Sequence, residues 1–166
     1  MTLERGLQFN TVDVGLWEAW PVAGEPTADP YSKALFARIG SVWMSSTEGL
    51  ALVARTDTEG AGLTGQCRYR ISGVVPRGRL WTLTATATEP RQPELDSYLT
   101  SDDVIWDEDQ SLTVTISARV FPGNWLPVSE ETNRFELVLR IYDTPLASGG
   151  LDDTVRPPVI EREVCL

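Results

Sequence analysis

The sequence has no histidine, a single lysine and only two cysteines among its 166 residues. Without histidine, the chain alone cannot build a Ser-His-Asp or Cys-His nucleophile, an imidazole metal site or a histidine pH switch. The two cysteines lie too far apart for a Cys-x-x-Cys metal motif. We therefore expect no metal, no other cofactor and no identifiable catalytic residue.

The chain also lacks any run of about 18–20 apolar residues, the length that a membrane-spanning helix needs. No signal peptide is recognisable either. The opening residues, MTLERGLQF, are more typical of the remainder behind a removed anchor than of the start of a folded element. Membrane contact is expected only through an N-terminal anchor that the printed residues do not contain.

Positive charge is scarce, because 14 basic residues stand against 24 acidic ones and give a net charge of −10. Nucleic-acid phosphates and anionic membrane surfaces would both be repelled by such a chain. We therefore expect no nucleic-acid partner. The acidic balance is sufficiently explained by solubility.

What the chain does have is enough apolar material for one domain: 42% of its residues are hydrophobic and six are tryptophan. A chain of this length buries roughly 68–70% of the surface that its unfolded form exposes. Each indole needs a buried body and a hydrogen-bond partner for its N–H group. The tryptophans thus indicate either a well-packed interior or a recognition surface.

Alternation of apolar and polar residues predicts a mainly β fold. The clearest strand is 134–142, where the core-facing positions are Phe135, Leu137, Leu139 and Ile141. The same period predicts further strands at 50–55, 66–72, 81–88, 111–120 and 159–164. Glycine- and proline-containing turns separate them, which favours an antiparallel β-sandwich of jelly-roll type.

One short helix is predicted ahead of the strands. Asp29 is suited to the N-cap, Pro30 to the first helical position and Gly40 to the end of the helix. Residues 1–28 show neither helical nor strand period and predict an extended arm. The expected organisation is thus an arm at 1–28 and a single β-sandwich domain at 29–166.

A small-ligand site is predicted from four residues around the 134–142 strand: Asn124, Trp125, Arg140 and Tyr142. Arg140 and Tyr142 share one face of that strand, and the guanidinium fork beside a phenol suits a sugar or a carboxylate. In the alternative, Trp125 only closes the end of the sandwich and Arg140 pairs with a glutamate.

Three further chemistries compete with plain packing as interpretations of single residues. Cys67 and Cys165 could form a disulfide that closes a loop of 98 residues, the alternative being two buried thiols. Asp107 and Asp109 lie on an acidic hairpin tip, but a calcium loop is not predicted because its ligand spacing and its glycine are missing. Carboxylates such as Glu136 could form an acid–base pair, although no particular pair is selected by the sequence.

Several motifs together resemble the bacterial domain-of-unknown-function family 1214. They are PGNWLP followed by FELVLRIYDTP, with RYRISG and RLWTLTA before them and PPVIERE near the end, over roughly residues 49–165. The resemblance implies a jelly-roll β-sandwich that an N-terminal anchor would hold in the periplasm, tethered to the inner membrane. It implies no established activity and no catalytic residues.

Three functions follow as hypotheses. The first is a non-catalytic envelope module that binds a glycan or another envelope component, such as a protein, through an aromatic and arginine-bearing surface. The second is a carboxylate-dependent hydrolase that acts on sugar polymers. The third is a structural domain whose apolar patch docks a partner chain or a second copy as a homodimer.

Overall fold

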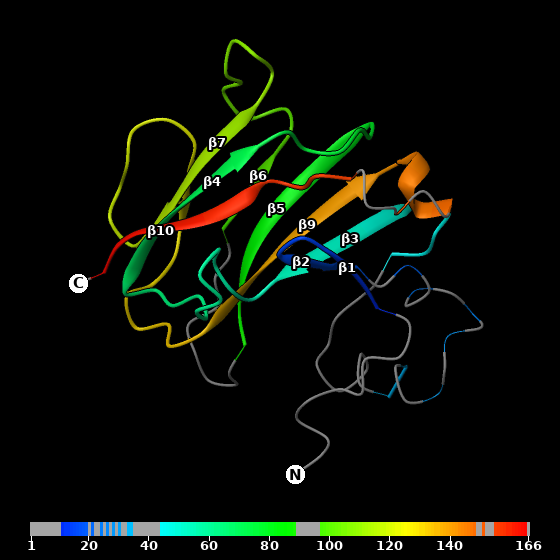
Figure 1. The fold of residues 1–166 in the computed structure, drawn as a ribbon, viewed down its shortest axis with the longest axis horizontal. Helices are drawn as coiled ribbons and strands as arrows, with labels where there is room; N and C mark the ends of the chain where they lie inside the picture. Colours follow the sequence, from blue (N-terminus) through cyan, green and yellow to red (C-terminus); the bar gives the residue numbers. More distant parts are fainter. Residues whose placement is uncertain are drawn as a thin grey trace.

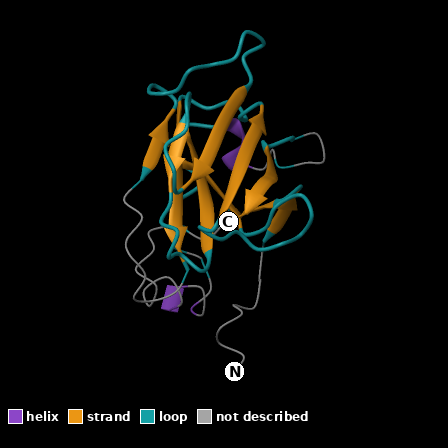
Figure 2. Ribbon diagram, turned by 90° about the vertical axis from the view of Figure 1, so that its left-hand side faces the viewer, coloured by secondary structure: helices purple, strands orange, loops and turns teal. Residues whose placement is uncertain are grey.

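The computed structural model describes residues 11–19, 44–88, 97–148 and 155–165, together with positions 21, 24, 26, 28, 30, 33, 34 and 151. In these residues the chain forms two β-sheets that face each other (Figures 1 and 2). The larger sheet has the order β1 (Val12–Val14), β2 (Trp17–Ala19), β3 (Gly49–Ala54), β9 (Phe135–Tyr142), β5 (Leu80–Ala87) and β6 (Tyr98–Thr100). The smaller sheet has the order β10 (Val159–Cys165), β4 (Cys67–Gly73), β7 (Leu112–Ser117) and β8 (Trp125–Pro127).

Strand β9 is the centre of the larger sheet, as its alternating sequence predicts. It pairs antiparallel with β3 on one side and with β5 on the other, so that Leu139 lies opposite both Leu52 and Leu83. All three leucines are buried in the core. Each fully buried side chain of this size contributes about 1.5–3 kcal/mol, so this row alone fixes the register of three strands.

The core fills the space between the two sheets. Tyr69 of β4 meets Phe135 of β9 edge to face, with ring centroids 5.9 Å apart. The buried indole of Trp17 donates a hydrogen bond of 2.7 Å to the carbonyl of Pro158, the residue before β10. One short 3-10 helix, η1 (Pro145–Ser148), follows β9 and places Ala147 in the same core.

The mainly β, two-sheet architecture is confirmed, whereas the jelly-roll type is not supported. A jelly roll is built from antiparallel neighbours, but β7 and β8 pair in parallel here. The sheets also divide the strands six to four. The parallel pair arises because the chain leaves the end of β7, loops through residues 118–124 and returns alongside the same strand.

The N-terminal predictions fall mostly outside the described residues. This holds for most of the helix predicted from Asp29 to Gly40 and for most of the arm at 1–28. Residues 12–19 of the arm are described, and they form the β1–β2 hairpin that extends the larger sheet. None of the helical segments among the described residues has the length and hydrophobicity of a membrane span.

The predicted disulfide between Cys67 and Cys165 is confirmed. The two residues lie directly opposite each other in the antiparallel pairing of β4 with β10. The bond joins residues 98 positions apart, and it therefore restricts the unfolded chain far more than the folded one.

Removal of this bond should lower the free energy of unfolding by about 4–5 kcal/mol, the chain-entropy value for a loop of this length. Urea unfolding of the oxidised protein, the reduced protein and a Cys67→Ser/Cys165→Ser variant measures the loss. The double variant should match the reduced protein and should not respond to reductant. Equal unfolding midpoints for the oxidised and reduced protein would contradict the expectation.

Candidate functional site

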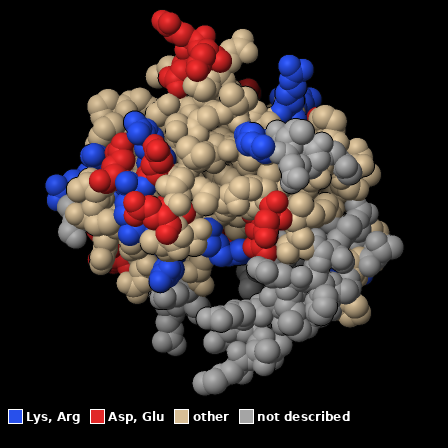
Figure 3. All heavy atoms as spheres, in the orientation of Figure 1, with Lys and Arg blue, Asp and Glu red and all other residues tan. Residues whose placement is uncertain are grey.

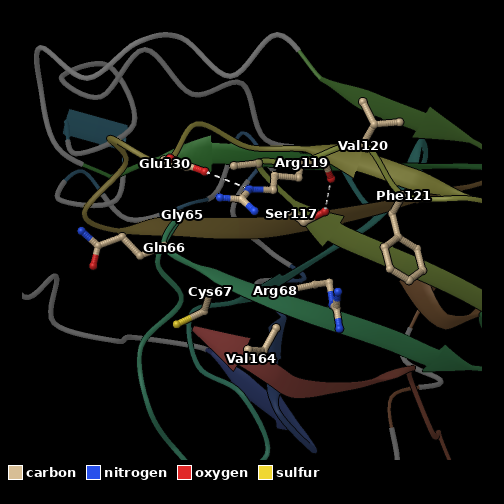
Figure 4. Close-up of a pocket in the computed structure, with 11 residues that line it drawn as sticks. Gly65, Gln66, Cys67, Arg68, Ser117, Arg119, Val120, Phe121, Glu130 and Val164 are labelled. Carbon is tan, nitrogen blue, oxygen red and sulfur yellow. Dashed lines mark hydrogen bonds and ion pairs between the residues drawn. The ribbon is translucent and has the colours of Figure 1, made fainter. Parts of the chain in front are cut away.

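A pocket of about 300 Å³ lies at the end of the smaller sheet where β4 begins and β7 and β10 end. Its walls come from residues 65–68 at the start of β4, from residues 117–121 at the end of β7 and just beyond it, and from Glu130 and Val164 (Figure 4). Three apolar side chains on or beside this wall are exposed to solvent, namely Val120, Phe121 and Val164. The pocket therefore combines apolar surface with polar side chains, as ligand sites commonly do.

Arg68 is held firmly in one wall of the pocket. Its Nε donates a 2.7 Å hydrogen bond to Glu163 of β10, and its guanidinium lies 5.0 Å from the centre of the Phe121 ring. A second arginine of β4, Arg70, pairs with Glu161 at 2.9 Å. The antiparallel register of β4 and β10 sets the basic side chains of one strand beside the acidic side chains of the other.

Arg119 lies on the opposite wall and is bound far less tightly. Its Nε is 3.8 Å from a carboxylate oxygen of Glu130, which is an ion pair but too long for a hydrogen bond. The Arg119 side chain is 79% exposed. Its backbone is fixed, however, because the hydroxyl of Ser117 donates a 2.6 Å hydrogen bond to the Arg119 carbonyl (Figure 4).

Trp125, one of the predicted site residues, lies beside this pocket. Leu126 next to it points into the core, so the Trp125 ring lies on the outer face of the smaller sheet. The indole N–H donates to the carbonyl and to the hydroxyl of Ser117, at 3.1 and 3.2 Å. Because Ser117 lines the pocket, Trp125 is coupled to the pocket wall through one residue.

Asn124 has a structural role in the described chain. Its side-chain amide accepts a hydrogen bond from the Ile105 N–H and donates to the Ile105 and Thr113 carbonyls, at 2.7, 2.7 and 2.9 Å. Two of these bonds fasten the loop between β6 and β7 to the start of the edge strand β8, and the third joins Asn124 to strand β7. Asn124 thus satisfies backbone groups that would otherwise lack partners.

Arg140 and Tyr142 lie on β9, on the outer face of the larger sheet. Arg140 makes a long hydrogen bond of 3.5 Å to Thr84 on the neighbouring strand β5. The core of the sandwich therefore lies between this pair and Trp125. Asn124 and Trp125 thus lie together at β8, and Arg140 and Tyr142 lie together on β9. The structure does not bring these two pairs into one site.

Paired carboxylates also occur on the outer face of the larger sheet. Arg55 bridges Glu18 and Glu136, binding one oxygen of each. Burial raises the pKa of Glu136 above its usual value, and the Arg55 charge opposes that shift. Glu18 is only 8% exposed. The guanidinium lies between the two acids, and one of the acids is buried. This arrangement is therefore better suited to holding β2, β3 and β9 together than to acid–base chemistry on a polymer.

The acidic tip at 107–109 is organised by its own hydrogen bonds. Asp107 accepts hydrogen bonds from the hydroxyls of Ser111 and Thr113, and Asp109 accepts from the Ser111 hydroxyl and N–H. The hydrogen bonds from Ser111 lower the pKa of the Asp109 carboxyl. Within the described ranges, no group of three or more potential ligands could hold a metal ion.

A family model described as a protein of unknown function, DUF1214, matches residues 48–146. The chain belongs to the DUF1214 family. The matched range contains β3 to β9, and therefore most of the sandwich and both arginine-bearing walls of the pocket, while β10 lies beyond it. The resemblance inferred from the sequence motifs is thus confirmed at the level of the family.

Two solved structures share the fold of this DUF1214 chain. A protein from Vibrio parahaemolyticus is 20% identical with a TM-score of 0.61, over 82% of this chain and 36% of that one. An uncharacterized protein from Burkholderia cenocepacia is 20% identical with a TM-score of 0.52, over 97% of this chain and 38% of that one. The chain thus spans less than two fifths of either relative. No curated protein matches it.

Replacement of Glu136 by glutamine should make stability less dependent on pH. A carboxyl whose pKa is raised by folding binds its proton more tightly in the folded state, so the wild type loses stability as pH rises from the unfolded pKa through the folded one. Glu136→Gln removes that loss, and its stability relative to wild type should increase from pH 4 to pH 7.

Thermal unfolding of both proteins across this pH range measures the effect. Glu161→Gln, which removes an exposed carboxylate from the smaller sheet, is the matched control and should show no comparable trend. A difference in stability between Glu136→Gln and wild type that stays constant at all pH values would contradict the burial argument.

Proposed function

We propose that this DUF1214 domain is a non-catalytic binding module that holds a glycan in the pocket between β4, β10 and the 117–121 segment. The observation that carries the proposal is the composition of that pocket. The exposed Phe121 ring lies against Arg68, and Arg119, Gln66 and Glu130 line the same pocket. A sugar ring offers an apolar face for an aromatic side chain and hydroxyl groups for fixed donors and acceptors.

Preorganisation supports this proposal. Arg68 is held from two sides by Glu163 and the Phe121 ring, and the segment carrying Arg119 is anchored by Ser117. Little side-chain entropy is lost when a ligand binds to a side chain that is already fixed, as that of Arg68 is. The site is therefore suited to recognising a weakly binding, hydroxyl-rich ligand.

The non-catalytic part of the proposal is supported by the acids near the pocket. Both Glu130 and Glu163 are ion-paired to arginines. A glycosidase needs one carboxylic acid and one free carboxylate on opposite sides of the scissile bond. Carboxylates that are neutralised by arginine are poorly suited to donate a proton, whereas they position donors well for binding.

We further propose that the domain works in the bacterial periplasm. The disulfide between Cys67 and Cys165 supports this, because such bonds persist in oxidising compartments and are rare in the cytosol. Alkylation of thiols in intact cells, followed by non-reducing electrophoresis, tests the proposal. Free thiols in the native protein would contradict it.

Ligand binding should change the tryptophan fluorescence, because Trp125 is hydrogen-bonded to Ser117 in the pocket wall. Titration with cell-wall fragments and oligosaccharides should give a saturable response in the micromolar to millimolar range. Trp125→Phe should lose most of that response while it retains affinity in calorimetry.

Phe121→Ala should weaken the same binding by about tenfold, the loss typical of an aromatic contact. Tyr98→Ala removes another exposed aromatic ring, on β6 of the larger sheet, and serves as the control with unchanged affinity. No response of the wild type to any saccharide at millimolar concentration would count decisively against the proposed function.

A further inference from the structure

The two arginines of the pocket differ in how much of their hydrogen-bonding capacity is already used. Arg68 donates to Glu163 and covers the ring of Phe121. Arg119 has no side-chain hydrogen bond within the described part of the chain, and its nearest carboxylate, Glu130, stays 3.8 Å away. One guanidinium in the pocket is therefore fixed by the protein, while the other keeps its donors for a ligand.

We infer that the bound glycan is acidic, and that Arg119 receives a carboxylate of the saccharide in place of Glu130. This inference rests on the proposed function, because it names the chemical class of ligand for the same pocket. A planar guanidinium presents parallel N–H groups that match the two oxygens of one carboxylate. Glu130 approaches the Arg119 guanidinium only to 3.8 Å. A ligand carboxylate would take its place and come within hydrogen-bond distance.

The charge around the pocket is balanced rather than acidic. The whole chain carries a net charge of −10, but the pocket is lined by two arginines and one glutamate. Glu163 compensates Arg68 from outside the lining, so the charge near Arg119 depends on Glu130 alone. In Figure 3, acidic and basic groups lie interspersed at the left of the molecule. Figure 1, in the same orientation, draws β4 and β10 on that side. An anion can therefore approach this end of the smaller sheet with less repulsion than the net charge alone implies.

The arrangement of apolar groups indicates a ring rather than a simple carboxylate. Val120 and Phe121 follow Arg119 directly in the sequence, and both are exposed. A carboxylate carried on a sugar ring can reach the guanidinium while the ring lies against Phe121, from which the Val120 side chain points away (Figure 4). A uronic acid, in which the carboxylate replaces the terminal hydroxymethyl group of the sugar, has this combination.

Matched acid and ester ligands test the inference. Oligomers of galacturonic, glucuronic and mannuronic acid are titrated by calorimetry, each beside its methyl ester, which keeps the sugar backbone but removes the charge. At least one acid should bind about tenfold more tightly than its ester. This preference should decrease as salt rises, because the pair at Arg119 is solvent-exposed.

Three variants localise the preference to Arg119. Arg119→Gln should reduce the difference between acid and ester to less than twofold. Glu130→Gln removes the competing carboxylate and should strengthen acid binding several-fold. Arg77→Gln makes the same change of charge at an exposed position outside the pocket, and its acid preference should equal that of the wild type.

The outcomes separate the two proposals. Equal binding of acids and esters, or tighter binding of the esters, overturns the inference and leaves the proposed function standing. A preference that survives in Arg119→Gln also overturns it. If neither acids nor esters bind, and the other saccharides fail as well, both proposals fall.

Discussion

The last strand of the chain, β10, pairs antiparallel with β4 and brings residues almost a hundred positions apart into contact. Besides the backbone pairing, three kinds of side-chain interaction hold the two strands together: the disulfide, the ion pairs of Arg68 and Arg70 with acids of β10, and the burial of Ile160. The pairing also builds the pocket, because β10 supplies both Val164 in its wall and the carboxylate that fixes Arg68. Loss of this contact would therefore affect the fold and the candidate site together.

A buried ion pair extends the same constraint to the loop before β4. Asp57 is fully buried, and one of its oxygens accepts hydrogen bonds from the N–H groups of Glu59 and Ala61. Its other oxygen lies 2.8 Å from Arg162 of β10, at an angle that makes the contact electrostatic rather than a hydrogen bond. The Arg162 guanidinium also donates to the Gly62 carbonyl. A buried carboxylate is costly unless it is compensated in this way, so the loop and the C-terminal strand are held as one unit.

The sequence predicts the strands of this fold better than it predicts the site. Alternation identifies β9 and β4 because one face of each is buried and most of the other face is not. It misses β2, where Trp17, Glu18 and Ala19 are all buried and no alternation remains. Alternation also tells which face of a strand a side chain occupies, but not which sheet the strand joins. The structure accordingly places Trp125 and Arg140, which the alternation predicts in one site, on different sheets.

The pocket itself could not be read from periodicity, because the residues that distinguish it lie in turns. Arg119, Phe121 and Glu130 belong to irregular segments, and their proximity depends on how the sandwich closes. Turns at the ends of strands can change without disturbing the buried alternation that maintains the sheets. Two solved structures with only 20% identity share this fold, so the sandwich tolerates extensive substitution. A site built from its turns can accordingly differ from one protein to the next, and a ligand has to be argued from residues such as Arg119 rather than transferred with the fold.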